Sequence, residues 1–400
     1  MLMSPVVSYI VFPFMAALLA AIWVFPRVLR ISLDKNIVDN PDARKLQRYP
    51  VPVLGGMVVQ AGILVALCVA DLFMDCSNLY TIVLAMSIML FIGTIDDILD
   101  IRPIMRFMLE VLVALMIIYT CDYSLDNLHG LWGVWELSPW VSVPLTIVTV
   151  VGVINSINLI DGVDGYSSGY CVMACIMFGV FFYLVGDIPM TMLAVVCAAA
   201  LIPFFFHNVF GRESKMFIGD GGTLLMGCVM SVFVLNILKS STHCELYCAT
   251  GLGLVPFTLA VLCVPVFDTV RVMTMRMIRK TSPFTADKTH LHHMFIELGF
   301  SHIGTTVSIL TLNCLVVLGW SLSYQLGANI DVQLYVVIAL SLLVTVGFYY
   351  GMRLCGNMGW KPYRIMQRVG RFTHVERKGF FLWIQRFLDR DAITKSQEKA

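Results

Sequence analysis

Two adjacent carboxylates, Asp96 and Asp97, stand at the end of a long apolar run of the sequence. Like charges repel one another and lose hydration near a membrane, so such a pair needs a physical reason. A solvated helix end would tolerate the pair, whereas a metal ion, a basic substrate group or a proton transfer would make use of it. Because repulsion favours keeping one proton, one of the two could serve as a base near neutral pH.

A second cluster repeats polar residues every three positions, namely Asn155, Asn158, Asp161 and Asp164. In a helix this spacing puts the four side chains on one face. A glycine follows each of the two aspartates, which predicts that the helix breaks there. Carboxylate and amide oxygens suit Mg²⁺ and can also hydrogen-bond a nucleotide. The alternative is a polar seam between helices, although seams are usually built from small residues and isolated polar ones.

A third cluster, Gly219-Asp220-Gly221-Gly222, opens another apolar run. Glycines beside a helix N-terminus make a backbone that binds phosphate well. The carboxylate of Asp220 would oppose a phosphate unless a cation lay between them, which points to a bridging Mg²⁺. An aspartate that simply caps its own helix explains the motif equally well.

Three histidines, His290, His292 and His293, lie in a loop that basic residues precede. A zinc site is one interpretation, but no cysteine or suitably spaced partner supplies the remaining ligands. Imidazoles that contact a diphosphate agree better with the other clusters, and a solvated polar loop is the third interpretation. Asp268, close before the loop, is expected to pair with a cation such as Arg271.

The fifth cluster is a basic loop that contains Lys45 and ends at Gly55 and Gly56. Its Pro and Gly residues indicate a shaped loop in which Lys45 could bind phosphate. The basic residues could also do no more than fix the orientation of the chain in a membrane.

The elements that must position these clusters are membrane helices. Of the 400 residues 58% are hydrophobic and 13% are charged, and soluble domains have about 25% charged residues. We therefore predict an all-α, polytopic integral membrane bundle of about eleven transmembrane helices. The net charge of +1 gives no sign of a nucleic-acid partner, and we expect none. The predicted spans are 5–26, 53–72, 79–95, 104–121, 139–157, 167–186, 190–207, 221–239, 249–270, 304–324 and 331–351.

Orientation follows from the basic residues, which gather on the cytoplasmic side of membrane proteins. With the N-terminus outside and the C-terminus in the cytoplasm, all 27 Lys and Arg residues except Lys239 fall in inner segments. All five clusters then lie on the inner side. The predicted domains are a transmembrane domain, 1–351, and a basic tail, 352–400, which is either solvated or an amphipathic helix on the anionic inner leaflet.

The five clusters, in their order along the chain, resemble the motifs of the polyprenyl-phosphate N-acetylhexosamine-1-phosphate transferase family, of glycosyltransferase 4 type. The resemblance covers residues 1–350 and does not extend to the tail. One branch of the family uses UDP-MurNAc-pentapeptide and typically carries a run of three histidines. The His290-Leu-His292-His293 loop and the Asp96-Asp97-Ile-Leu-Asp100 segment look like the other branch, which uses UDP-GlcNAc or a related UDP-HexNAc.

The resemblance implies transfer of GlcNAc-1-phosphate from UDP-GlcNAc to undecaprenyl phosphate, with release of UMP, at the cytoplasmic face of a bacterial inner membrane. It implies Mg²⁺, which Mn²⁺ could replace, on Asn158 and Asp220. Asp96 and Asp97 would act on the lipid phosphate, and the chain could form a homodimer. Asp161 and Asp164, counted with them as catalytic, would hold nucleotide or sugar. The expected substrate-binding residues are Lys45, Asn155, Gly219, His290, His292 and His293.

Other functions stay open on the sequence alone. A transferase for phospho-MurNAc-pentapeptide is the alternative within the family. A secondary transporter would place its polar residues near the middle of the membrane, often in repeated halves, and no repeat is visible. A membrane scaffold without catalytic activity would not need the acidic residues of the motifs.

Overall fold

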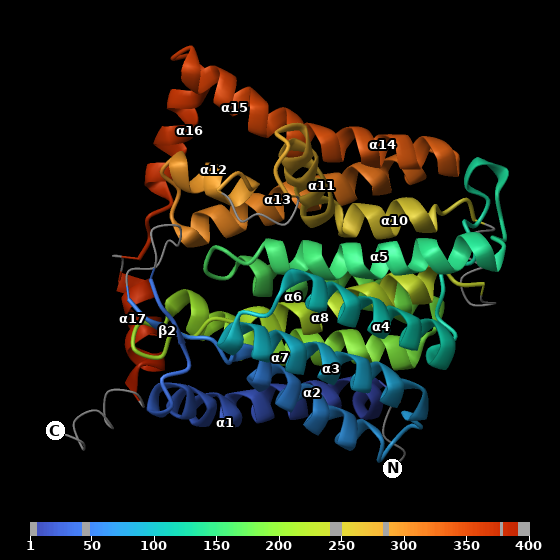
Figure 1. Ribbon diagram of the computed structural model, residues 1–400, viewed down its shortest axis with the longest axis horizontal. Coiled ribbons are helices and arrows are strands. Elements are labelled where there is room, and N and C mark those ends of the chain that lie inside the picture. Colours follow the sequence, from blue (N-terminus) through green and yellow to red (C-terminus); the bar gives the residue numbers. More distant parts are fainter. Residues whose placement is uncertain (1–5, 42–48, 241–249, 283–287, 377–378, 391–400) are drawn as a thin grey trace.

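The structure is a computed structural model of the chain, and it describes residues 6–41, 49–240, 250–282, 288–376 and 379–390. Within these ranges the chain is mostly helical (Figure 1). The helices in chain order are α1 (Phe12–Asp34), α2 (Gly55–Ala70), α3 (Ser77–Leu99), α4 (Pro103–Cys121), α5 (Pro139–Leu159), α6 (Tyr166–Val185), α7 (Ile188–Phe210), α8 (Gly219–Leu238), α10 (Leu254–Val261), α11 (Cys263–Ile278), α12 (Leu291–Glu297), α13 (His302–Gln325), α14 (Ile330–Leu342), α15 (Phe348–Asn357), α16 (Lys361–Phe372) and α17 (Gly379–Leu388).

Short elements of other kinds complete the described chain. A π-helical turn, η1 (Val7–Val11), leads into α1, and a second one, η3 (Leu343–Gly347), joins α14 to α15. A 3₁₀ turn, η2 (Leu131–Gly133), lies between α4 and α5. Strands β1 (Val38–Asp39) and β2 (Val51–Pro52) pair antiparallel, with Val38 opposite Pro52. The strands bracket the segment that contains Lys45, which itself lies outside the described residues.

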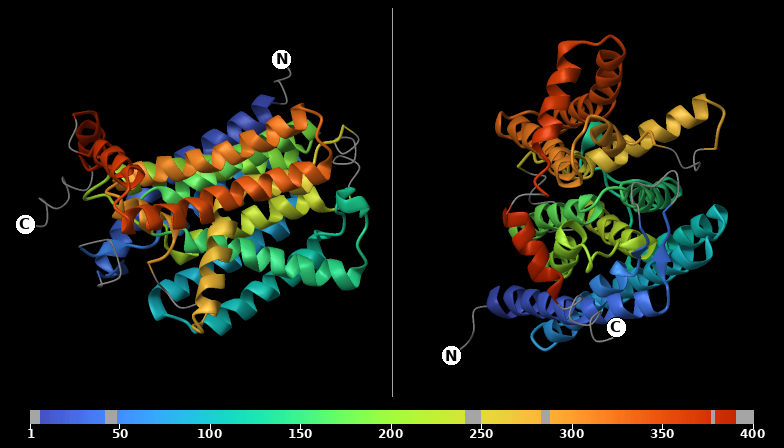
Figure 2. Two further views of the ribbon diagram at one scale, coloured as in Figure 1. Left: turned by 90° about the horizontal axis from the view of Figure 1, so that it is seen from above. Right: turned by 90° about the vertical axis from the view of Figure 1, so that its left-hand side faces the viewer.

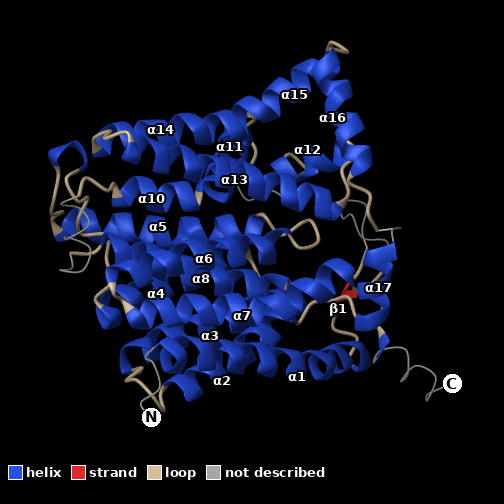
Figure 3. Ribbon diagram, turned by 180° about the vertical axis from the view of Figure 1, so that it is seen from behind, coloured by secondary structure: helices blue, strands red, loops and turns tan. Residues whose placement is uncertain are grey.

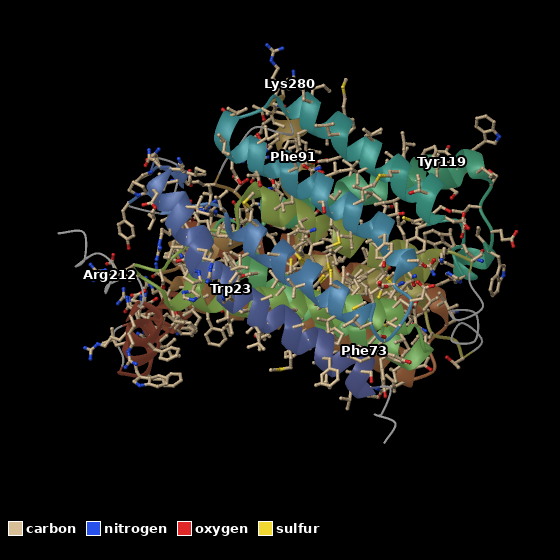
Figure 4. All side chains as sticks on the ribbon, turned by 90° about the horizontal axis from the view of Figure 1, so that it is seen from below. Trp23, Phe73, Phe91, Tyr119, Arg212 and Lys280 are labelled. Atoms are coloured by element: carbon tan, nitrogen blue, oxygen red, sulfur yellow. The ribbon has the colours of Figure 1, made fainter. Side chains whose placement is uncertain are left out.

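The prediction of a polytopic helical membrane protein is confirmed, although not the count of eleven spans. Among the described residues nine helices are long and apolar enough to cross a membrane, or ten if the bent pair α10 and α11 is one span. Helix α2 has 16 residues, so its length of about 24 Å is less than the roughly 30 Å of a bilayer core. Large apolar side chains such as Trp23, Phe91 and Tyr119 are exposed on the outside of the bundle, as lipid contact requires (Figure 4).

The predicted span 249–270 is not one continuous helix. Helices α10 and α11 meet at an angle of 74°, and α11 leaves the bundle obliquely (Figure 2). Pro265 has no N–H to donate to the carbonyl of Val261, and its ring disfavours a straight helix there. That carbonyl instead accepts hydrogen bonds from the Tyr170 hydroxyl at 2.6 Å and from Asn313 Nδ2 at 3.1 Å.

Helix α8 lies in the middle of the bundle with α5 and α6, while α1 and α14 lie on opposite outer sides (Figure 3). All residues of α8 except Asp220 are buried. Glycines allow its close contacts: a Cβ on Gly93 of α3 would lie 2.4 Å from the Asp220 backbone, and one on Gly227 would lie 2.7 Å from Ile154 of α5. Small residues at such contacts let membrane helices approach closely. Asp220 is thereby held at a fixed place on the end of the bundle.

The segments predicted on the inner side share one end of the bundle. Strand β2, helix α12 and the C-terminal helices α16 and α17 lie at this end, at the left of Figure 1. The last long helix runs continuously from Ile330 to Asn357, so the predicted start of the tail at 352 falls within it. Which end of the bundle faces the cytoplasm stays a prediction.

Candidate active site

The acidic pair at the end of α3 meets the N-terminus of α8. Asp97 Oδ1 accepts the backbone N–H of Asp220 at 3.1 Å, and Asp97 Oδ2 accepts that of Gly221 at 3.4 Å. Gly219 has φ +72°, and a Cβ there would lie 2.5 Å from Asp97 Oδ2. Asp97 therefore caps α8 from a neighbouring helix, which leaves the Asp220 carboxylate directed into the site instead of at its own backbone.

Arg106, in the first turns of α4, connects these elements to α5. Its Nη1 lies 3.4 Å from Asp96 Oδ2 and 3.3 Å from Asp220 Oδ2. Its Nη2 donates to Asn158 Oδ1 at 2.7 Å, and its Nε donates to Glu110 Oε1 at 3.1 Å. One guanidinium group thus contacts side-chain oxygen atoms of α3, α5 and α8.

Asn155 lies one turn before Asn158 on α5 and extends the same cluster. Its Oδ1 accepts from Arg106 Nη2 at 3.3 Å, and its Nδ2 donates to Glu110 Oε2. The Glu110 side chain is 1% exposed, so its carboxylate is acceptable there only with such partners. Asn158 Nδ2 donates to Asp220 Oδ1 at 2.8 Å, so the two residues predicted as metal ligands are in direct contact.

The polar stripe is not one helical face. Helix α5 ends at Leu159, so Asn155 and Asn158 lie on the helix and Asp161 and Asp164 lie in the following loop. The glycines after the two aspartates end the helix as predicted, and Gly165 has φ +75°. The stripe continues as a loop because the glycines favour conformations that a helix cannot use.

Asp161 lies in this loop. The residue is partly exposed to solvent, but protein atoms surround much of its carboxylate. Desolvation raises the pKa of Asp161 to about 7, and the nearby charges of Asp220 and Asp164 act in the same direction. The Ser167 hydroxyl donates to Asp161 Oδ1 at 2.6 Å and opposes the rise. Asp161 can therefore gain or lose a proton near neutral pH.

Asp164 has two side-chain partners from distant segments, Lys215 and His302. Its Oδ2 lies 2.6 Å from Lys215 Nζ and 2.7 Å from His302 Nδ1. Burial by itself would favour the neutral acid, but the hydrogen bond from His302 and the charge of Lys215 outweigh it, so the pKa of Asp164 is lowered. The ionised Asp164 therefore joins the loop after α5 to the segment before α8 and to the first residue of α13.

The histidine loop is fixed to α11 through Asp268. Asp268 Oδ1 pairs with Arg271 Nη2 at 2.7 Å, and Asp268 Oδ2 lies 2.9 Å from His290 Nδ1 and 3.1 Å from the backbone N of Leu291. Arg271 Nη2 also donates to the Thr289 carbonyl at 2.6 Å. The pairing of Asp268 with a nearby cation is confirmed, and it leaves the other ring nitrogen of His290 directed away from Asp268.

The histidine loop meets the loop after α5. A Cβ on Gly162 would lie 2.6 Å from His292 Nε2, and the ring centroids of His292 and His293 are 4.3 Å apart. Burial together with the charges of His293 and His290 lowers the pKa of His292 well below its ordinary value, so its imidazole is neutral. His290 Nε2 and His292 Nδ1 are buried without a hydrogen-bond partner in the described part of the chain, which leaves both available to a ligand.

Four residues of this constellation were not predicted. Arg106 and Lys215 were attributed only to the orientation of the chain, and His302 follows the predicted cluster closely in sequence. Glu110 could have been predicted from the sequence, because a carboxylate inside an apolar membrane segment usually marks a functional site. The partners of the other three depend on contacts between distant segments, which the spacing of residues in sequence does not reveal.

The chemistry of the cluster fits a divalent cation bound together with a substrate. No three His, Cys, Asp or Glu side chains are placed to hold a metal ion within the described ranges. Asn158 Oδ1 and Asp220 Oδ2 nevertheless face the same cation, the guanidinium of Arg106. Oxygen donors of this kind suit Mg²⁺, which usually keeps several waters and takes further ligands from substrate phosphates.

Comparison with known proteins agrees with this arrangement. The model of a family described as glycosyl transferase family 4 matches residues 79–238. This stretch runs from α3 to α8 and contains the acidic pair, the asparagines of α5 and the Gly219-Asp220 turn. The family predicted from the motifs is thus confirmed, while the histidine loop and the C-terminal helices lie outside the segment matched to glycosyl transferase family 4.

The chain is also similar to proteins that are named as transferases acting on undecaprenyl phosphate. It is 27% identical over 354 residues to the undecaprenyl-phosphate alpha-N-acetylglucosaminyl 1-phosphate transferase of Salmonella typhi, covering 87% of this chain and 91% of the relative. The protein of that name from Escherichia coli strain K12 is 27% identical over 88% of this chain and 92% of its own length. A Bacillus subtilis protein named probable undecaprenyl-phosphate N-acetylglucosaminyl 1-phosphate transferase is 27% identical over 73% of this chain and 79% of its own.

Proposed function

We propose that the protein transfers GlcNAc-1-phosphate, or a related HexNAc-1-phosphate, from its UDP-sugar to undecaprenyl phosphate. The reaction releases UMP and starts a lipid-linked glycan at the cell surface. The relatives from Salmonella typhi and Escherichia coli are named for transfer of this kind to undecaprenyl phosphate. The enzyme would lie in a bacterial inner membrane with its site on the cytoplasmic face, where the nucleotide sugar is found. A homodimer stays a prediction.

The observation that carries the proposal is the convergence of α3, α4, α5 and α8 on one guanidinium group. Asp96, Asp220, Asn155 and Asn158 all lie within hydrogen-bond distance of Arg106. Such a cluster at the end of a membrane bundle can hold both a diphosphate and its counterion, and it is close to where a lipid phosphate would lie. A transporter would place the same groups near the middle of the membrane.

The reaction needs little covalent help from the protein. A phosphate oxygen of the lipid attacks the β-phosphorus of the UDP-sugar, and the bond from that phosphorus to the bridging oxygen of UMP breaks. The lipid phosphate is mostly ionised at neutral pH, so positioning and charge neutralisation should dominate, as in other phosphoryl transfers. Arg106 would bind phosphate oxygens, and Asp97 would keep the backbone of α8 in place through its two accepted hydrogen bonds.

A magnesium ion, or manganese in its place, would be held by Asp220 and Asn158. When bound, it would neutralise the charge that develops on the diphosphate. Arg106, which faces the same two side chains, would move toward the phosphates and remain their second positive partner.

The donor would bind on the side of the histidine loop. Neutral His292 and the buried nitrogen of His290 can hydrogen-bond the diphosphate or the sugar. Asp161 and Asp164 lie next to the contact between the loop after α5 and the histidine loop. They would hold the nucleotide or the sugar hydroxyls. Lys45, Gly219 and His293 keep their predicted roles in substrate binding.

Purified protein in lipid nanodiscs should be given undecaprenyl phosphate, Mg²⁺ and a panel of UDP-sugars, with UMP measured by chromatography. The proposal predicts UMP release with UDP-GlcNAc or another UDP-HexNAc, and its loss when EDTA removes the metal. Release with UDP-MurNAc-pentapeptide alone would assign the other branch of the family. Absence of UMP with every donor, together with uptake of a sugar into proteoliposomes, would favour a transporter.

A further inference from the structure

We propose that the C-terminal segment, 361–376 and 379–390, is a strap that positions both side-chain partners of Asp164, Lys215 and His302. The strap is attached at two points. Asp389 binds the segment that contains Lys215, and Thr373 binds the residue before His302. Both residues would be positioning residues, because they act on the site through other residues. The inference rests on the proposed function, since it assigns the strap to the donor side of that same site.

The first attachment is a buried carboxylate at the end of an exposed helix. No residue of α17 is buried, whereas Asp389, directly after it, is only 4% exposed. Asp389 Oδ1 accepts the backbone N–H of Ser214 at 3.0 Å and its hydroxyl at 2.8 Å, and Arg212 N lies 3.2 Å away. Figure 4 shows Arg212 beside the C-terminal helices. Burying a carboxylate is costly without such donors, so this contact is specific.

This contact fixes the segment that carries Lys215. Ser214 immediately precedes Lys215, whose Nζ pairs with Asp164 Oδ2 at 2.6 Å. Two residues later Phe217 N donates to the Pro52 carbonyl at 2.7 Å, and the segment then enters α8 at Gly219. The lysine therefore lies between two backbone anchors, one of which is the C-terminal strap.

The second attachment holds the start of α13. Thr373 Oγ1 accepts the backbone N–H of Ser301 at 2.9 Å, and the Ser301 hydroxyl donates to the Thr373 carbonyl at 2.7 Å. Ser301 caps α13, because its hydroxyl oxygen also accepts the N–H of Gly304 at 3.1 Å. The next residue is His302, whose Nδ1 lies 2.7 Å from Asp164 Oδ2.

Both attachments help to hold a partner of Asp164 in place. Each joins the strap to the residue immediately before a partner of Asp164, and the two partners come from segments more than 80 residues apart in sequence, Lys215 and His302. Because an ion pair depends strongly on distance and geometry, loosening either segment should displace the loop of Asp161 and Asp164. The strap should therefore affect binding of the UDP-sugar more than binding of the lipid acceptor.

The test compares Asp389→Ala and Asp389→Asn in the full chain with Arg386→Gln, which changes an exposed charge one turn earlier on α17. Hydrogen exchange of the peptides covering 207–220 is measured by mass spectrometry, with UMP release measured in parallel. We expect faster exchange and an approximately tenfold higher KM for the UDP-sugar in Asp389→Ala, with kcat and the acceptor KM changed less. Asp389→Asn should recover part of both, because its amide oxygen still accepts a hydrogen bond, and Arg386→Gln should match the wild type.

A double-mutant cycle with Lys215→Met separates positioning from general stabilisation. If Asp389 acts through Lys215, adding Asp389→Ala to Lys215→Met should raise the donor KM little further. Fully additive effects, or unchanged exchange and kinetics in Asp389→Ala, would overturn the inference. If the wild type released no UMP from any donor, the proposed function would fail, and the exchange experiment would still decide whether Asp389 holds this segment.

Discussion

Arg106 joins three helices of the site through one guanidinium group. It contacts carboxylates of α3 and α8 and amide oxygens of α5, so its charge stabilises an arrangement of like-charged groups that would otherwise separate. A single cation in that place must also meet any diphosphate that enters the site. We therefore expect Arg106 to have two functions, holding the side chains of the site together and neutralising the charge of the substrate.

Replacing Arg106 by lysine should lower kcat for UMP release by about 100-fold, the effect of losing one charge-stabilising group in an active site. A lysine keeps the charge but cannot contact several oxygens in the fixed geometry of a guanidinium group. The control is Arg102→Lys, an exposed arginine at the start of the same helix. Equal activity of the Arg106→Lys variant and the wild type would mean that Arg106 has only an orienting role in the membrane.

Gly219→Ala should remove activity and lower stability, because the position combines φ +72° with a Cβ only 2.3 Å from the Val53 carbonyl. Strain of the backbone alone costs roughly 1–3 kcal/mol. Gly133→Ala separates backbone strain from steric clash, since Gly133 has φ +74° but open space where the Cβ would lie. We expect a lower thermal midpoint in both variants and loss of UMP release only in Gly219→Ala. Normal activity in Gly219→Ala would contradict the tight cap at α8.

At the scale of elements, the site is a meeting of helix ends and loops. The motifs could be predicted from the sequence because carboxylates, glycines and histidines are conspicuous in apolar surroundings. Their contacts could not, since Arg106 and Lys215 find partners more than 40 residues away. The bend between α10 and α11 was not predicted, because the segment is mostly apolar and its two prolines, Pro256 and Pro265, do not by themselves tell where a helix bends.

The contact between the loop after α5 and the histidine loop can be tested with Gly162→Ala. The added Cβ would lie 2.6 Å from His292 Nε2, and the burial of His292 limits its room to move. We expect kcat/KM for the UDP-sugar to fall about tenfold, or 1.4 kcal/mol, with little change in thermal midpoint. Gly152→Ala on α5, where a Cβ meets nothing within 4 Å, serves as the matched control. If both variants behave alike, the two loops do not cooperate in donor binding.

For the whole molecule, the decisive feature is that the polar clusters share one end of a helical membrane bundle. Composition was sufficient to predict membrane helices, and the basic residues were sufficient to propose an orientation. The number of spans was harder to predict, because α2 is apolar but short and because α10 and α11 form a bent pair that can count as one span. The role of the C-terminal segment was invisible in sequence, since Asp389 resembles any other charge of a basic tail.

The orientation predicts that Lys280, just after α11 (Figure 4), lies in the cytoplasm and that Trp135, between α4 and α5, lies outside. Cysteines placed at these two exposed positions can be probed in intact cells with a maleimide that does not cross membranes. The cysteine at 135 should react in intact cells, and the cysteine at 280 should react only after the cells are opened. The reverse pattern would place the site outside and would contradict a cytoplasmic nucleotide sugar as donor.

In the proposed reaction the protein transfers a phosphosugar and not the sugar alone. The most direct test gives the purified protein UDP-GlcNAc labelled at the β-phosphorus, with undecaprenyl phosphate and Mg²⁺, and follows the label. We expect the label to move to the lipid while an equal amount of unlabelled UMP is released. Label that leaves as UDP, or that stays in the donor with every UDP-HexNAc tested in the same way, would contradict it.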